Sequence, residues 1–302
     1  MTSTPDPLRL RLPATSANLG PGFDALGLAM DLYLTIEASL SPEFRIDASG
    51  RNPELCASLE KNLILDTYTS ILHANSRQVQ PIYLALHNEI PLGMGCGSSA
   101  AALLAGVALA NHFGNLAWSN QQILQEACRR EGHPDNVAAC WLGGMTASKM
   151  QEGQVFTATC GQSLDWKLML VLPSASLSTQ KARALLPDTY SRADAVANIQ
   201  STALLVAAFA QNRPDLLRIA MHDRIHQPYR SEACPLLPLL LPLPMESGVY
   251  GVSLSGAGPS ILLVLAPESD TSRITASVVA AVTPYTPEIL VTSIACNTGQ
   301  SS

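Results

Sequence analysis

The chain has 302 residues, of which 47% are hydrophobic and 14% are charged. These proportions exclude a disordered protein and leave enough apolar surface for two domains with cores of their own. The formal net charge of −6 argues against non-specific binding to nucleic acid, because phosphate backbones attract clustered basic side chains.

Neither a membrane span nor a disulfide framework is expected. Residues 1–7 lack the cationic segment and apolar core of a signal peptide, and proline interrupts the apolar stretch over residues 236–243. The seven cysteines are odd in number and scattered, without a Cys-x-x-Cys pair. This usage indicates reduced thiols in a cytoplasmic protein.

The first predicted elements are two strands that flank a polar loop. Apolar and charged residues alternate over residues 8–12, and strand character resumes over residues 32–37. Between them, Asn18 and Asp24 stand in a glycine-rich loop with Thr15 and Ser16. Two interpretations stay equal here: hydrogen bonds to a small ligand, or an Asx-type loop in which these side chains bond their own backbone.

A helix over residues 62–72, with Asn62 as its N-cap, and a strand over residues 82–90 lead to a glycine-rich stretch. In that stretch Gly93, Gly95 and Gly97 alternate with other residues, and Ser98 begins an alanine-rich helix. Glycine lets backbone N–H groups converge on an anion, and a helix N-terminus adds a positive dipole end. The order of strand, loop and helix therefore predicts a phosphate site.

Two better-known phosphate patterns do not fit this loop. A Walker A loop requires a lysine after its last glycine, where Ser98 stands, and a dinucleotide fingerprint requires a glycine at that same position. The alternative to a phosphate site is a glycine-rich turn before a core helix. Cys96, inside the loop, is interpreted as a small packing residue rather than a nucleophile.

Farther along, a helix over residues 120–130, capped by Ser119 or Asn120, precedes a turn at Gly132. The turn would present His133, Asp135 and Asn136 together, as a ligand site or as an ordinary turn. For His133 two interpretations are equal: its ring packs beneath a site, or it contacts a ligand. By composition alone, Glu126 is a solvated charge on the helix surface.

The second half of the chain is predicted to form a separate packing unit. A hairpin turn over residues 151–154 comes before the boundary; beyond it we expect strands over residues 166–172, 249–254, 261–265 and 288–296 and helices over residues 194–222 and 272–281. Thr179 and Arg183 lie one helical turn apart and so share a face. Gly256, in a tight turn, lets the backbone approach a ligand closely.

Three stretches together resemble the motifs of the GHMP family of small-molecule kinases, and among them the homoserine kinases. These are residues 13–27, residues 91–102 and residues 254–260, to which residues 131–138 add the sequence Glu-Gly-His-Pro-Asp-Asn-Val-Ala. The resemblance implies an α+β fold with two domains. A domain like ribosomal protein S5 domain 2 would span residues 1–163, and a ferredoxin-like domain residues 164–302.

The resemblance also implies ATP and Mg²⁺ as cofactors. Ser99 and Glu126 take the positions of the metal ligands, although either Ser98 or Ser99 could reach the ion. The ATP-binding positions are Pro91, Leu92, Gly93, Met94, Gly95, Cys96, Gly97, Ser98, Ser99 and Ala100.

For the substrate, L-homoserine, the resemblance implies a carboxylate bound by Arg183 and Arg230 and an amino end near Asn18 and Asp24. Thr179 and Gly256 complete the substrate positions, while Asp135 and Asn136 would aim the hydroxyl. The first motif has no lysine, which argues against the aspartate–lysine base of mevalonate and galactose kinases. The family also implies a homodimer.

Two other functions are weighed against this one. The first is a GHMP kinase that acts on a different small alcohol. Residues 131–138 together with Arg183 and Arg230 argue against it. The second is a non-catalytic nucleotide-binding relative, which would be expected to lack Glu126, Asp135 or a loop glycine; all of them are present.

Overall fold

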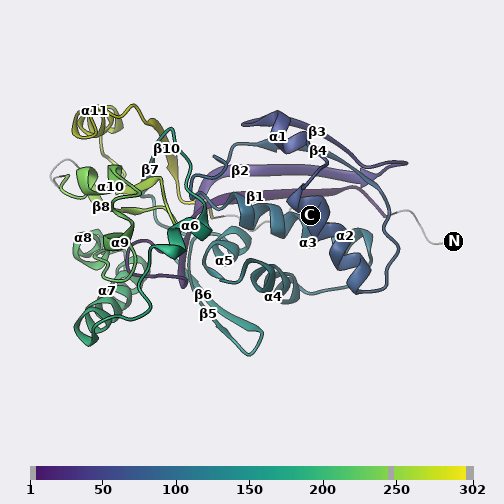
Figure 1. Cartoon of the computed structure of the whole chain (residues 1–302), viewed down its shortest axis with the longest axis horizontal. Coiled ribbons are helices and arrows are strands. Elements are labelled where there is room, and N and C mark those ends of the chain that lie inside the picture. The colour runs from purple at the N-terminus through teal and green to yellow at the C-terminus, as the bar shows by residue number, and fades with distance from the viewer. Residues whose placement is uncertain (1–4, 244–247, 297–302) are drawn as a thin grey trace.

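The strands of this protein form two sheets. The computed structural model describes residues 5–243 and 248–296. Residues 1–4, part of the segment in which no signal peptide is expected, lie outside the described residues. The chain runs through one sheet with its helices and then through the other, and the two units lie side by side in Figure 1.

The first sheet has six strands in the order β3-β4-β2-β5-β6, with β1 paired to β2. The long strand β2 joins its two sides, because its beginning pairs with β5 and its end pairs with β4. The strands are β1 (Leu8–Ala17), β2 (Leu26–Leu40), β3 (Arg45–Gly50), β4 (Ile82–Asn88), β5 (Met145–Gln151) and β6 (Gln154–Cys160).

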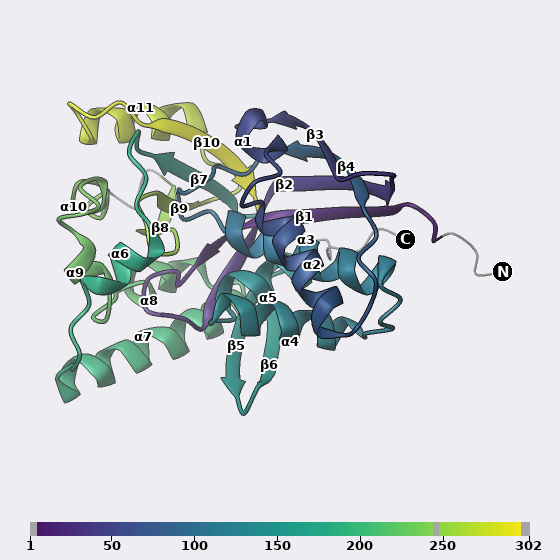
Figure 2. The same cartoon turned by 45° about the vertical axis from the view of Figure 1, so that its right-hand side comes forward.

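Helices α2 to α5 gather on one side of this sheet (Figure 2). The Asn62 side chain accepts hydrogen bonds from the N–H groups of Ile64 and Leu65, which confirms it as an N-cap. Ser119 caps α4 in a capping box with Gln122. The helices are α1 (Pro53–Ala57), α2 (Leu63–Ala74), α3 (Ser98–Phe113), α4 (Asn120–Glu131) and α5 (Asp135–Leu142).

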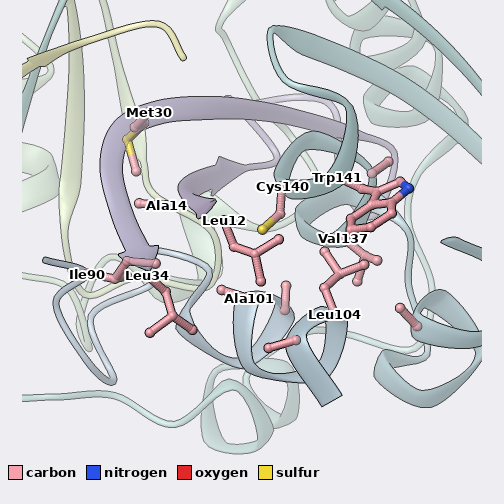
Figure 3. Packing of buried hydrophobic residues seen from close by; sticks show 14 of the residues in the cluster. Leu12, Ala14, Met30, Leu34, Ile90, Ala101, Leu104, Val137, Cys140 and Trp141 are labelled. Carbon is pink, nitrogen blue, oxygen red and sulfur yellow. The ribbon is translucent and has the colours of Figure 1, made fainter. Parts of the chain in front are cut away.

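The core of this unit fills the space between sheet and helices (Figure 3). Leu12 of β1, Leu104 of α3 and Val137 of α5 are fully buried there. Helix α3 is rich in alanine and glycine, and a Cβ on Gly106 would lie 2.5 Å from Cβ of Thr67 in α2. Small side chains thus let α3 approach α2 closely.

The second sheet has the order β10-β7-β9-β8, and all its pairs are antiparallel. Helices separate β7 from β8 and β9 from β10, which confirms the predicted ferredoxin-like β-α-β-β-α-β order. Its elements are β7 (Lys167–Leu172), α6 (Thr179–Ala184), α7 (Arg192–Ala210), η1 (Pro214–Leu216), α8 (Leu217–Ala220), α9 (Gln227–Arg230), α10 (Leu236–Leu240), β8 (Val249–Leu254), β9 (Ile261–Leu265), α11 (Thr271–Ala281) and β10 (Glu288–Ser293).

Several details differ from the sequence-based expectations. Strand β3 and helix α1 were not predicted, and the predicted turn at residues 133–136 runs directly into α5. The helix expected over residues 194–222 ends at Ala210, and η1 then begins at Pro214, a residue without the N–H that a helix interior uses. By length and hydropathy alone α7 could cross a membrane, contrary to the expectation that no segment could; within the fold, however, its Leu205, Ala208 and Phe209 are buried.

Candidate active site

The glycine loop between β4 and α3 is packed between two other segments. A Cβ added to Gly97 would lie 1.9 Å from Oγ1 of Thr15, and one on Gly95 would lie 2.2 Å from the carbonyl oxygen of Ser255. Both glycines also have positive φ angles, near +73°. These positions therefore require glycine for space as well as for backbone conformation.

Hydrogen bonds join the loop to segments far away in the sequence. The Thr15 N–H donates to the carbonyl of Cys96 at 3.0 Å, and the Ser255 hydroxyl donates to the carbonyl of Gly95 at 2.8 Å. The Asn18 side-chain amide donates to the carbonyl of Gly256 at 2.8 Å. The polar loop after β1, the glycine loop and the turn after β8 thus form one structure.

A pocket of about 180 Å³ lies where these segments meet. From the predicted ATP positions it is lined by Gly93, Gly95, Cys96, Gly97, Ser98 and Ser99, and from the predicted substrate positions by Asn18, Asp24, Asp135, Asn136, Thr179, Arg183, Arg230 and Gly256. Pro91, Leu92, Met94 and Ala100 are not among its lining residues.

Asp135 is buried at the start of α5, at the floor of the pocket. Its Oδ1 accepts hydrogen bonds from Nδ1 of His133 at 2.6 Å and from the N–H of Asn136 at 2.7 Å. Within the described residues every hydrogen bond found for this carboxylate goes to Oδ1, which leaves Oδ2 for a ligand. Asn136 is held in turn, since its Oδ1 accepts the Thr15 hydroxyl at 2.7 Å.

His133, whose part the sequence left open, both lines the pocket and binds Asp135. Burial by itself lowers the pKa of this imidazole, but the hydrogen bond and the charge of Asp135 outweigh burial and hold the pKa above its ordinary value. The hydrogen bond to Asp135 therefore favours the protonated form of His133.

Asp24 and Arg183 both line the pocket and bind each other in a bidentate ion pair. Arg230 lies deeper and is almost completely buried. The ring of Phe23 lies beneath both cations, 5.4 Å from the guanidinium carbon of Arg183 and 5.5 Å from that of Arg230. Sequence reasoning missed Phe23, although it directly precedes Asp24.

The structure does not bring Glu126 to the pocket. Its carboxylate binds Arg129 and Arg130, and Arg130 also donates to Ser70 of α2. Burial by itself raises the pKa of Glu126, but these arginines outweigh burial and hold it below its usual value. Glu126 therefore lies in an ion-pair cluster outside the pocket lining, away from the position expected of a metal ligand.

Glu131, at the end of α4, lines the pocket beside Ser99. Its Oε2 accepts a hydrogen bond from the hydroxyl of Ser99 at 3.1 Å, at the N-terminus of α3. Burial is the largest effect on this carboxyl and raises its pKa. One feature of the sequence could have pointed to Glu131. It stands directly before Gly132, the residue at which α4 ends and the chain turns into the pocket.

Three further pocket side chains, Asp24, His133 and Asp135, place potential ligand atoms within 4.8 Å of one another. Two of them already bond each other and the third binds Arg183, so these groups have partners within the protein. Burial raises the pKa of the Cys96 thiol to about 12, which agrees with a packing role and not with a nucleophile.

A second cavity, of about 370 Å³, begins beside the glycine loop. Ser98 lines both cavities, and Leu92 lines the second. Most of its other lining residues are apolar and come from β2, α1, α2, β4, α3 and the segment after β4. They are Leu34, Leu55, Cys56, Leu63, Ile64, Leu86, Ile90 and Ala102, and Asn62 also lines the cavity.

Comparison with known proteins gives the same family for both halves of the chain. The family model for the GHMP kinases N terminal domain matches residues 62–144, and that for the GHMP kinases C terminal domain matches residues 205–282. A homoserine kinase of Solibacter usitatus is 48% identical over 84% of this chain and 84% of its own length. One of Desulfitobacterium hafniense is 41% identical over 85% of this chain and 87% of its own length.

Solved structures share the whole arrangement. The crystal structure of homoserine kinase from Cytophaga hutchinsonii superposes with a TM-score of 0.80 at 26% identity, covering 98% of each chain. The L. major mevalonate kinase, at 15% identity and a TM-score of 0.73 over 96% of each chain, shares the fold alone.

Proposed function

This chain belongs to the homoserine kinases of the GHMP kinase family, and from that membership we propose that it transfers the γ-phosphoryl group of ATP to the side-chain hydroxyl of L-homoserine. The products are ADP and O-phospho-L-homoserine, a step in threonine biosynthesis. The observation that carries the proposal is a single pocket in which a glycine loop faces a buried carboxylate and two arginines.

The glycine loop would bind the phosphates of ATP. The support is geometric: Gly93, Gly95 and Gly97 line the pocket directly before the N-terminus of α3, where free N–H groups and the helix dipole favour an anion. The apolar cavity shared through Ser98 would hold the adenine ring. Filling it with Ala102→Phe should raise KM for ATP, and an unchanged KM would contradict the assignment.

Mg²⁺ prefers oxygen ligands, and Ser99 with Glu131 supplies a hydroxyl and a carboxylate beside the glycine loop. This donor set fits the ion, so we propose these two residues as its holders, in place of Ser99 and Glu126. When bound, the ion would neutralise negative charge on the phosphate oxygens.

L-homoserine would occupy the side of the pocket opposite the glycine loop. Guanidinium groups match carboxylates in geometry and charge, so Arg183 and Arg230 would bind the carboxylate of the substrate. Asp24 and Asn18 would face its amino end. Thr179 and Gly256 also line the pocket, Gly256 beside Gly95 of the glycine loop.

The reacting hydroxyl would lie at Asp135 and Asn136. Its oxygen attacks the γ-phosphorus, a new O–P bond forms, and the bond to the β-phosphate oxygen breaks with its electron pair leaving on ADP. The free Oδ2 of Asp135 accepts the hydroxyl hydrogen bond and aims the oxygen, while the proton leaves to the transferred phosphoryl oxygens. Loss of turnover in Asp135→Asn with unchanged homoserine affinity would instead make Asp135 the base.

We keep the domain boundary between residues 163 and 164 as a proposal. Its support is that the first sheet ends at Cys160 and the second begins at Lys167. We also propose that the protein acts in the cytoplasm, where ATP is available.

We propose further that the protein is a homodimer paired through α7. The outer face of this helix carries Val196 and Ile199, which are 47% and 68% exposed, and Ala203, Val206 and Ala210 continue the stripe at spacings of three and four. Arg213, just beyond the helix, pairs with Asp215 of its own chain. The support for self-association is therefore the apolar surface of this stripe.

The function is tested by measuring ADP release with Mg²⁺ and ATP, using L-homoserine, L-serine, mevalonate, galactose and shikimate as acceptors beside a control without acceptor. Turnover confined to L-homoserine is the expected result. Turnover of another acceptor would overturn the substrate assignment, and ATP binding without any turnover would favour a non-catalytic protein.

A further inference from the structure

Arg230 is an unusual cation, because only 1% of its surface is exposed and no ion pair joins it to an acidic side chain within residues 5–243 and 248–296. A buried charge without a counter-ion is costly unless neutral groups hydrogen-bond it. Here Nε donates to the carbonyl of Ala182 at 3.2 Å, and Nη1 donates to Nδ1 of His226 at 3.0 Å. For Nη2 no hydrogen bond is found within the same residues, and Arg230 lines the pocket.

His226, which is itself completely buried, uses both of its ring nitrogens. Nε2 lies 2.7 Å from the carbonyl oxygen of Gly20, which can only accept, so this nitrogen carries the hydrogen. Nδ1 faces a guanidinium N–H, which can only donate, so Nδ1 is the acceptor. The geometry thus selects the neutral imidazole with its hydrogen on Nε2.

The surroundings of His226 hold this ring in place. The carboxylate of Asp223 accepts the backbone N–H groups of His226 and Gln227, at 3.0 and 2.6 Å, and its Oδ2 lies 3.5 Å from Nε2 of the ring. Phe23 stacks on the imidazole with 5.3 Å between the ring centres. Through Gly20 and Phe23 the ring is therefore tied to the loop that carries Asp24.

We propose that His226 is a positioning residue that fixes the guanidinium of Arg230 for the carboxylate of the substrate, by accepting its Nη1 hydrogen bond as a neutral imidazole. This inference rests on the proposed function and adds to it a residue without direct contact to substrate. The ring holds Arg230 of α9 in place relative to the loop after β1. Its contact in that loop is Gly20, which lies 206 residues away from His226 in the sequence.

Two substitutions separate this role from simple packing. An asparagine at position 226 can place its side-chain oxygen near the position of Nδ1, and so keep an acceptor for Arg230. A glutamine places its amide nearer the position of Nε2, and so keeps the contact to Gly20 instead. His226→Asn should therefore retain substrate recognition better than His226→Gln. His222→Gln, at an exposed histidine four positions away, serves as the control.

The readout is the ratio of kcat/KM for L-homoserine to kcat/KM for L-homoserinamide, in which a neutral amide replaces the carboxylate. In His226→Gln this ratio should fall at least about tenfold, with KM for ATP changed less than about twofold, because only the carboxylate interaction is weakened. A packing defect would lower kcat/KM for both substrates equally and leave the ratio unchanged. The Arg230→Gln variant should show no further fall in the ratio when His226→Gln is added.

An equal ratio in wild type and His226→Gln would overturn the inference while leaving the proposed function intact. Absence of homoserine turnover in the wild type would instead overturn the proposed function. Should the variants not fold, the ¹⁵N chemical shifts of the wild-type imidazole provide the test, since a charged ring or a hydrogen on Nδ1 at neutral pH would contradict the inference equally.

Discussion

Arg183 and Asp24 form a bidentate ion pair, with 2.9 Å between Nη1 and Oδ2 and 2.6 Å between Nη2 and Oδ1. The two residues were expected at opposite ends of the amino-acid substrate, yet in this structure they bind each other. An amino acid carries an ammonium and a carboxylate, which are opposite in charge to Asp24 and Arg183 respectively. The ion pair therefore holds both groups in place where the zwitterion would enter.

Asp24→Asn should raise KM for L-homoserine by about tenfold or more, because a charged hydrogen bond to the ammonium group contributes about 1.5–3 kcal/mol. KM for ATP should stay unchanged. Asp31→Asn is the matched control, since Asp31 pairs with Arg11 on the surface and lies outside the pocket. Equal homoserine KM values in Asp24→Asn and wild type would contradict the assignment.

The two glutamates of α4 should behave differently. Glu131→Gln should weaken the Mg²⁺ dependence of ATP binding by about tenfold or more, because it removes a charged oxygen ligand. Glu126→Gln should leave that dependence unchanged and lower stability by about 1 kcal/mol through its arginine pairs. Isothermal titration of ATP at several Mg²⁺ concentrations measures the first effect, and urea unfolding measures the second. The reverse pattern would restore Glu126 as the metal ligand.

Gly95→Ala should abolish tight ATP binding, because its Cβ would meet the backbone of Ser255 and force the glycine loop away from the turn after β8. Gly153→Ala provides the control: this glycine also has a positive φ, but no heavy atom lies within 4 Å of its added Cβ. The control should cost only about 1 kcal/mol of stability from backbone strain. If both variants bound ATP equally well, the packing of the loop would not matter for the site.

The His133–Asp135 pair should make stability depend on pH. The pKa of His133 is raised in the folded protein, so the pair's contribution is complete below the unfolded pKa of 6.5 and is lost as pH rises through the folded value. Urea unfolding of wild type and His133→Asn from about pH 6 to about pH 9 should therefore show a difference that shrinks with rising pH. A difference that grew with pH would show that His133 is neutral in the folded state.

Ile199→Asp should convert the proposed homodimer to a monomer, because it places a charge at a strongly exposed apolar position of the stripe on α7. Val279→Asp, at an exposed apolar position on α11, should leave the dimer intact. Sedimentation velocity measures both. A monomeric wild type would refute the dimer, and co-sedimentation of the wild type with lipid vesicles would identify a membrane as the occupant of this face.

Much of the fold followed from local patterns. The strand, glycine loop and helix around residues 82–113 were predicted in the right order, because alternation, glycine spacing and a helix-forming run are all local signals. Strand β3 was missed because Ile46 is its one buried residue, so no alternating pattern marks it. Helix α5 was missed because its first residues, Asp135 and Asn136, also suit a turn.

The sequence by itself determined which chemical groups this protein has available: a glycine loop before a helix N-terminus, an Asp-Asn pair after a histidine, and two arginines in the second half. Only the tertiary structure decided that Glu131 and not Glu126 meets Ser99, that Asp24 binds Arg183, and that His226 holds Arg230. The reason is physical. Spacing along a chain places residues on one face of a helix, but which end of α4 meets α3, and which loop covers α9, depends on how two sheets and their helices pack over long sequence distances.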